Sequence, residues 1–143
     1  MDYRDIPMKK ICIIDGQGGG IGSAVIKKLK ERFEETVEVI ALGTNAIATA
    51  QMLKARANKG ASGTNAIVQT VRRADVIIGP VGIIMPHAMM GEMTRDMAEA
   101  VCLSDAKKVL LPLSQENISI VGVTGFPLPQ LVDELLDTHL TFL

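Results

Sequence analysis

Short apolar runs alternate with amphipathic segments along this chain. Residues 10–14 (KICII), 37–42 (VEVIAL), 74–79 (ADVIIG) and 108–113 are rich in β-branched and other apolar residues. Runs of this kind are typical of strands that are buried on both faces of a parallel sheet. Between the first two, apolar residues recur every three to four positions over 21–33, with lysines and glutamates between them, which predicts a helix. The pattern therefore predicts strands that alternate with helices.

Capping residues and prolines predict where the other helices begin. The letters GTNAI occur at residues 43–47 and again at 63–67, and each copy offers a polar cap before an apolar segment. Two copies do not make a solenoid, so we interpret them as two similar helix starts. Gly91 and a Thr94 cap divide a later helical region, and prolines open the last helix. The remaining helices are predicted at residues 46–57, 63–73, 86–103 and 127–140.

A fifth strand is predicted at residues 118–123, close behind the fourth. Only residues 114–117 separate the two, which is too short for a parallel crossover, so this strand is expected to pair antiparallel at the sheet edge. We predict an α/β, three-layer Rossmann-like fold with a mostly parallel five-stranded sheet in the order 2-1-3-4-5. A length of 143 residues fits one such domain, spanning residues 1–143.

This strand order predicts the place of a binding site. In open α/β sheets, ligands bind beyond the carboxyl ends of the strands, in the crevice where the strand order reverses. Here that crevice lies between the first and third predicted strands. Residues 16–22 and 79–82, which follow those strands, are therefore expected to face each other across it.

Five glycines fall within the seven positions from Gly16 to Gly22, directly after the first strand. Glycine lets a ligand approach the backbone closely, and the N–H groups at the start of a helix bind phosphate. The pattern G-x-x-x-G-I-G resembles the dinucleotide loop of short-chain dehydrogenases, with Asp15 in place of the usual threonine. The other interpretation is a sharp turn with close helix packing. The predicted ligand contacts are Asp15, Gly16, Gln17, Gly18, Gly19, Gly20, Ile21, Gly22, Thr44, Asn45, Gly79, Pro80, Val81 and Gly82.

Three absences limit the chemistry of this site. Short-chain dehydrogenases use a tyrosine and a nearby lysine, and the single tyrosine here, Tyr3, precedes the first strand. The acid expected after the second strand is replaced by Gly43-Thr44-Asn45, which weakens the case for NAD and leaves NADP or another nucleotide open. Ser23 stands where a Walker-type loop needs its lysine, which argues against NTP hydrolysis.

The composition of the chain limits the classes of partner that it is expected to bind. The net charge is −1 and the chain has one tyrosine and three phenylalanines, so neither a basic surface nor stacking platforms for nucleic acid are expected. No apolar run approaches the ~20 residues that cross a bilayer, and the N-terminus has no signal-peptide pattern, so a cytoplasmic location without membrane contact is expected. Cys12 and Cys102 are expected to be buried free thiols and not metal ligands.

Several other side chains are weaker candidates. His87 could serve as an acid or base near the crevice, although a cap or surface role suits it better. Thr64 and Asn65 suit helix capping more than ligand contact. Methionines recur every four residues from Met85 to Met97, which predicts a buried helix face or the interface of a homodimer. Glu92, Arg95 and Asp96 are expected on a solvated helix surface.

Four segments together resemble a known family. They are IDGQGGGIGSAVIKKL, ALGTNAIATAQMLKA, RADVIIGPVGII and GEMT, within residues 10–136. The segments resemble small bacterial proteins catalogued as a domain of unknown function, and the resemblance implies a Rossmann-like fold and transfers no catalytic residue. We expect a sensor or carrier that binds a phosphate-bearing small molecule, a nucleotide or dinucleotide. The alternatives are an enzyme completed by oligomerisation, with Asp15, Asn45 or His87 as polar groups, or an interaction module without a ligand.

Overall fold

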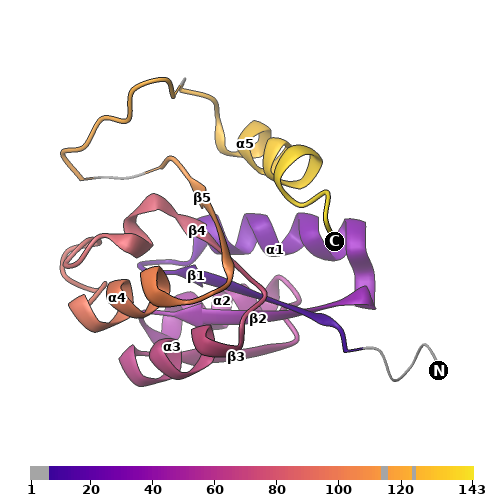
Figure 1. The fold of residues 1–143 in the computed structure, drawn as a ribbon, viewed down its shortest axis with the longest axis horizontal. Helices are drawn as coiled ribbons and strands as arrows, with labels where there is room; N and C mark the ends of the chain where they lie inside the picture. Colours follow the sequence, from indigo (N-terminus) through magenta and orange to yellow (C-terminus); the bar gives the residue numbers. More distant parts are fainter. Residues whose placement is uncertain (1–6, 114–115, 124) are drawn as a thin grey trace.

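The computed structural model describes residues 7–113, 116–123 and 125–143. One sheet runs through the middle of the molecule (Figure 1), and neighbouring strands lie in the order β3-β2-β1-β4-β5. Every pair of neighbours in this sheet is parallel. The strands are β1 (Lys9–Asp15), β2 (Val37–Gly43), β3 (Lys59–Ser62), β4 (Val76–Pro80) and β5 (Lys107–Leu111).

Helices cover both faces of the sheet. One apolar layer joins Ile11 and Ile13 of β1 to α1, α2 and α5, and the other joins Cys12 and Ile14 to α3 and α4. The alternation of side chains along a strand produces these two layers from one apolar run. The helices are α1 (Gly20–Phe33), α2 (Ala46–Lys54), α3 (Thr64–Thr70), α4 (Arg95–Leu103) and α5 (Leu128–Glu134), with shorter helical turns η2 (Glu34–Thr36), η3 (Val71–Arg73), η4 (Val81–Ile84) and η5 (Leu135–His139).

The predicted α/β fold is confirmed, and so is the order of its first four predicted strands, which are β2-β1-β4-β5 across the sheet. The antiparallel edge strand at 118–123 is wrong: its described residues form no strand, and part of the predicted 114–117 turn lies outside the described residues. The chain after β5 does not turn back along the sheet edge. It is bound to the segment before α4 instead, because the backbone N–H of Met89 donates to the Glu116 carboxylate at 2.9 Å. The fifth strand is instead β3, which pairs parallel with β2 at the opposite edge.

The predicted helix over 86–103 is only half correct. Its second half is α4, capped by the Thr94 hydroxyl, which accepts the N–H of Met97 at 3.2 Å. Its first half is irregular, because His87, Met89 and Met90 have φ angles of 69°, 60° and 57°. Left-handed backbone of this kind cannot continue a right-handed helix. We call residues 85–93 the strap.

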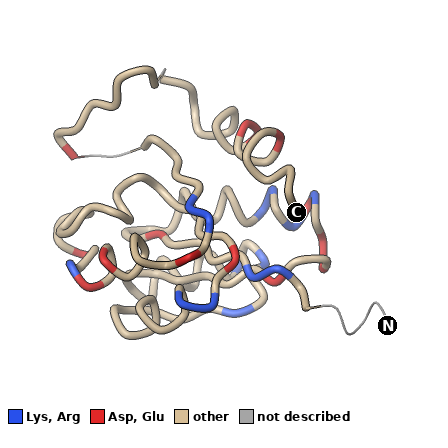
Figure 2. Tube along the Cα trace, in the orientation of Figure 1, with Lys and Arg blue, Asp and Glu red and all other residues tan. Residues whose placement is uncertain are grey.

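Charges lie mostly on the body of the molecule (Figure 2), with Lys and Arg mixed among Asp and Glu, and the long loop between β5 and α5 is nearly free of them. Within the described ranges, no helix has both the length and the apolar character needed to cross a bilayer. Tyr3, the single tyrosine, lies outside the described residues.

Candidate functional site

A cavity of about 290 Å³ opens at the carboxyl ends of β1 and β4. Both segments that were predicted to face each other contribute to it, the glycine-rich loop on one side and the start of η4 on the other. The chain that follows β5 closes it from a third side, which the sequence did not indicate. The lining residues are Asp15, Gln17, Ile21, Pro80, Gly82, Met89, Leu113 and Glu116.

Asp15 ties the loop to the start of α1. Its carboxylate accepts the backbone N–H of Gly16 at 2.8 Å and that of Gly22 at 2.7 Å, and the side chain is only 4% exposed. Burial raises the pKa of this carboxyl above its ordinary value of 3.8. Hydrogen bonds from Gly22, Gly16 and Ile21 oppose the rise, and the nearby charge of Glu92 adds to it. Asp15 therefore occupies N–H groups that a bound phosphate would otherwise use.

Three loop glycines are required by packing. A Cβ on Gly16 would lie 2.6 Å from both the Met89 sulfur and the Thr44 hydroxyl. A Cβ on Gly22 would lie 2.5 Å from the Met52 sulfur. Gly19 has a left-handed φ of 74° and would bring a Cβ within 2.7 Å of a backbone oxygen of α2. The turn interpretation explains Gly19 fully, because backbone atoms face it, and close side-chain packing favours glycine at the other two positions.

Gly18 and Gly20 have no such explanation. Both are exposed, neither has a left-handed φ, and a Cβ on either would meet nothing within 4 Å. Within the part of the chain that the structure describes, their N–H groups have no hydrogen-bond partner. They lie at the N-terminus of the 14-residue helix α1, whose first turn holds no acidic residue. These two amides are therefore open to a group that approaches from solvent.

Glu92 joins three of the loop and strand-end groups. One of its carboxylate oxygens accepts the N–H of Gln17 at 2.9 Å, the hydroxyl of Thr44 at 2.7 Å and the amide of Asn45 at 2.7 Å. Burial alone would raise the pKa of Glu92, but these three hydrogen bonds outweigh it and lower the pKa. The expectation of a solvated helix surface is wrong for Glu92, which lies half-buried ahead of α4.

The predicted ligand contacts after β2 are therefore engaged within the protein. Besides its bond to Glu92, Asn45 accepts the N–H of Ala48 at 2.8 Å and so caps α2. Its amide also donates to the carbonyl of Gln17 at 3.0 Å. Through Glu92 and Met89, the strap covers the β1–β2 side of the crevice and leaves the β1–β4 side open.

A comparison with known protein families identifies the family of this chain. A family model described as a domain of unknown function (DUF3842) matches residues 10–143. The chain belongs to the DUF3842 family. This match confirms the resemblance inferred from the four sequence segments, and the parallel sheet agrees with the Rossmann-like fold that it implied. A search of curated proteins found no match.

The other candidates in this DUF3842 chain lie outside the crevice cavity. His87 lines a separate depression of about 340 Å³ beside the start of α4. Thr64 contacts the Thr94 hydroxyl at 3.3 Å, and Asn65 lines the groove between α3 and α4. Gly79 is required by packing, since a Cβ there would lie 2.5 Å from a backbone oxygen of β1. Val81 lines the neighbouring groove along β5.

The methionine stripe is part of the core. Met93 and Met97 are buried, Met85 and Met89 pack against the same apolar cluster, and Met90 is 95% exposed. Four of the five methionines therefore pack into the core, but only Met97 lies on a helix, so the predicted helix face is wrong for the others. The homodimer interface predicted for this stripe stays a prediction.

The two thiols of the DUF3842 chain are expected to react at different rates. Burial raises the pKa of the Cys12 thiol to about 12, whereas Cys102 is exposed, so the expectation that both are buried is wrong for Cys102. Because the thiolate is the reactive form, iodoacetamide should modify one thiol per chain in the folded protein and two after unfolding. Mass spectrometry of the labelled protein checks this, and equal native labelling of Cys12 would contradict the buried position.

Proposed function

We propose that the crevice binds a small phosphate-bearing molecule of mononucleotide or sugar-phosphate type. The observation that carries this proposal is the pair of open amides at Gly18 and Gly20. Neither glycine is needed by the fold, and both N–H groups stand at the positive end of the α1 dipole, where an anionic group is stabilised. The phosphate would bind there, on the outer side of the loop.

The cavity beside the loop suits the rest of such a ligand. Ile21, Pro80, Met89 and Leu113 give it apolar walls, and the carboxylate of Asp15 supplies hydrogen-bond acceptors. A sugar or a base has hydroxyl or amino groups that donate to such acceptors and faces that pack on apolar walls. The volume of about 290 Å³ is at the small end for a ligand site.

The strap argues against a dinucleotide. In dinucleotide-binding folds, the adenosine ribose lies at the end of the second strand. That place is occupied here by the Glu92 carboxylate, which is bound to Thr44 and Asn45, and by the Met89 side chain over Gly16. A mononucleotide on the open β1–β4 side avoids the Glu92 carboxylate and meets Met89 only as one wall of the cavity. A sensor or carrier role needs nothing more than this binding.

Gly20→Val tests the proposal, because a side chain there would block approach to the amide, and its Cβ would meet nothing within 4 Å. For the unmodified protein, a thermal-shift panel of inorganic phosphate, ribose 5-phosphate, AMP and NADP should include a stabilising compound. At one hundred times its Kd, that compound adds ~2.7 kcal/mol of stability, or roughly 5–11 °C in Tm. The Gly20→Val protein should fold normally and lose most of this shift.

Gly125→Val is the matched control, since Gly125 also has open space around it and lies outside the crevice lining. It should keep the full shift. An equal shift in the Gly20→Val protein, or no shift with any phosphate compound, would refute phosphate binding at the loop.

Acid–base catalysis is a second candidate, favoured by one observation. Asp15 is a buried carboxylate with a raised pKa that lines the cavity, and such groups are common in active sites. Incubation of the stabilising compound with the protein, followed by ³¹P NMR, separates the two functions. An unchanged phosphorus spectrum after prolonged incubation supports a binding protein.

A further inference from the structure

The sheet has an open edge at β5. Among the described strands, β5 pairs only with β4, and its Lys107 N–H donates to the Asp75 carbonyl at 3.1 Å on the β4 side. Because alternate residues of a strand direct their N–H and C=O groups to opposite edges, those of Lys108 and Leu110 point away from β4. No backbone partner for these groups is found in the described part of the chain. Such an edge is ready to pair with another strand.

The chain also holds a strand-like segment that pairs with no strand in the described part of the chain. Residues 118–123 (ISIVGV) are rich in β-branched residues, yet they form no strand in the structure. Val121 is 100% exposed and Ile118 is 50% exposed. We call residues 116–123 and 125–127 the arch. The arch extends away from the body of the molecule between β5 and α5 (Figure 1), and its only charged residue is Glu116.

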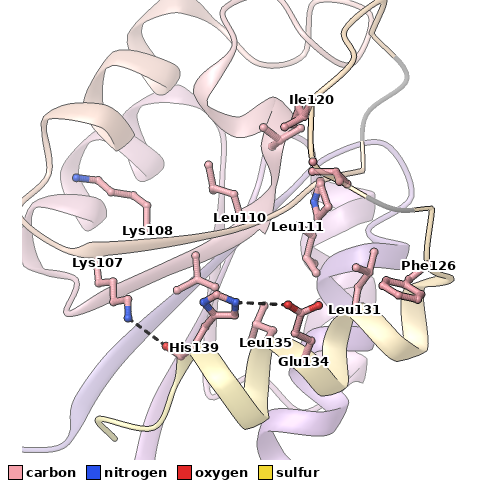
Figure 3. Close-up of a pocket in the computed structure, with 15 residues that line it drawn as sticks. Lys107, Lys108, Leu110, Leu111, Ile120, Phe126, Leu131, Glu134, Leu135 and His139 are labelled. Carbon is pink, nitrogen blue, oxygen red and sulfur yellow. Dashed lines mark hydrogen bonds and ion pairs between the residues drawn. The ribbon is translucent and has the colours of Figure 1, made fainter.

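An apolar groove lies between this segment and the open edge. Its volume is about 510 Å³, and its walls come from β5, the arch and α5. Figure 3 shows Leu110 and Leu111 of β5 on one side, Ile120 and Phe126 of the arch on another, and Leu131 of α5 below. Polar contacts gather at the far end, where the Lys107 ammonium donates to the His139 carbonyl at 3.3 Å.

Within one copy, the arch is held off the edge. Leu113 lines the crevice cavity, and Glu116 is bound by the Met89 N–H, so the chain after β5 continues past the end of the sheet and does not turn back. Pro112 at the end of β5 has no N–H to extend the ladder. The chain thus contains both members of a strand pair that it does not form with itself.

We propose that two copies of this chain form that pair reciprocally, with residues 118–123 of each copy bound as an added strand on β5 of the other. The arrangement is self-complementary, as a two-fold dimer requires. Strand addition supplies partners for the edge N–H and C=O groups. Ile120 and Val123, which line the groove of their own copy, would line the groove of the other copy after the exchange. A second copy is the occupant that fits, because the open edge and the strand-like segment are both on this chain, and residues 118–123 carry no charged side chain.

Val121→Lys tests this interface without touching the core, because Val121 is fully exposed in the single chain. Sedimentation equilibrium at high micromolar concentration should show a dimer for the unmodified protein and a monomer for the variant. Lysine on an added strand disfavours edge pairing. The circular dichroism spectrum of the variant should remain that of a folded α/β protein. Ile47→Lys is the matched control, since Ile47 is 68% exposed on α2 and far from the groove in sequence and fold, and it should leave the dimer intact.

Cysteine pairing distinguishes exchange between copies from a hairpin within one copy. In a Cys102→Ser background, a Lys108→Cys protein is mixed with an Ile120→Cys or a Val121→Cys protein and oxidised. Exchange between copies yields a disulfide-linked pair of the two different chains in at least one mixture. A second preparation carries Lys108→Cys together with Ile120→Cys or Val121→Cys in one chain. A monomeric unmodified protein, or disulfides that form within this doubly substituted chain but not between the mixed chains, would overturn the proposal. Neither experiment depends on the crevice ligand.

Discussion

Asp15→Ala is expected to lower the free energy of unfolding by about 2–6 kcal/mol, because each buried donor that loses its acceptor costs about 1–3 kcal/mol. Two such donors, the N–H groups of Gly16 and Gly22, bond to this carboxylate. Burial raises the pKa of Asp15, which means that the folded protein disfavours the charged form of this side chain. Its oxygens therefore stabilise the loop as hydrogen-bond acceptors, and its negative charge does not add to this stability. Asp15→Asn, which keeps one oxygen, should therefore cost about half as much, roughly 1–3 kcal/mol. Urea denaturation measures both changes.

Asp75→Ala is the control for this prediction. Asp75 also accepts a backbone N–H, that of Lys10 at 2.8 Å, but it is exposed, so water can replace the lost acceptor. We expect a cost of about 0.5–1.5 kcal/mol, the usual net value of one hydrogen bond. Equal losses for Asp15→Ala and Asp75→Ala would mean that the loop does not depend on a buried carboxylate.

Glu92→Gln is expected to cost about 1.5–3 kcal/mol at neutral pH, the range for hydrogen bonds to a charged group. The pKa of Glu92 is lowered in the folded protein by its bonds to Thr44, Gln17 and Asn45, against the opposing effect of burial. A lowered acid pKa means that the contribution is complete above the ordinary value of 4.5 and is lost as the pH falls through the folded pKa. The stability difference between the two proteins should therefore shrink below pH 4.5.

Denaturation curves from pH 3 to pH 7 measure this convergence. Glu99→Gln on the exposed side of α4 serves as the control, since Glu99 is exposed, and it should change stability by less than about 0.5 kcal/mol. A difference between the Glu92→Gln and unmodified proteins that is constant across this range would show that the carboxylate charge does not hold the strap.

Much of the fold was predictable because the buried strands carry an unambiguous pattern. β1 and β4 are short apolar runs next to glycine, and the two segments after them meet at one cavity as the strand order requires. β3 was missed because its sequence, KGAS, has neither β-branched residues nor alternation. Its pairing with β2 is set by its position in the sheet and not by local preference.

The errors near the site have a different origin. Residues 118–123 have a strong preference for strand structure, but the Glu116 contact with Met89 fixes the chain that leads into them. The contacts of Glu92 could not be predicted from the sequence, because 75 residues separate it from Gln17. The shape of the strap could not be predicted either, because it depends on left-handed residues other than glycine. Gly91 and the Thr94 cap were the local signals that the predicted helix is broken there.

The most direct test of phosphate binding at the loop is a ¹H–¹⁵N NMR titration of the labelled protein with AMP. We expect saturable movement of the amide signals of Gly18 and Gly20, with the amides of Gly16 and Gly22, already bonded to Asp15, moving less. Binding at these amides would be contradicted if the Gly18 and Gly20 signals stayed fixed while other signals moved. It would also be contradicted if they stayed fixed with both inorganic phosphate and AMP.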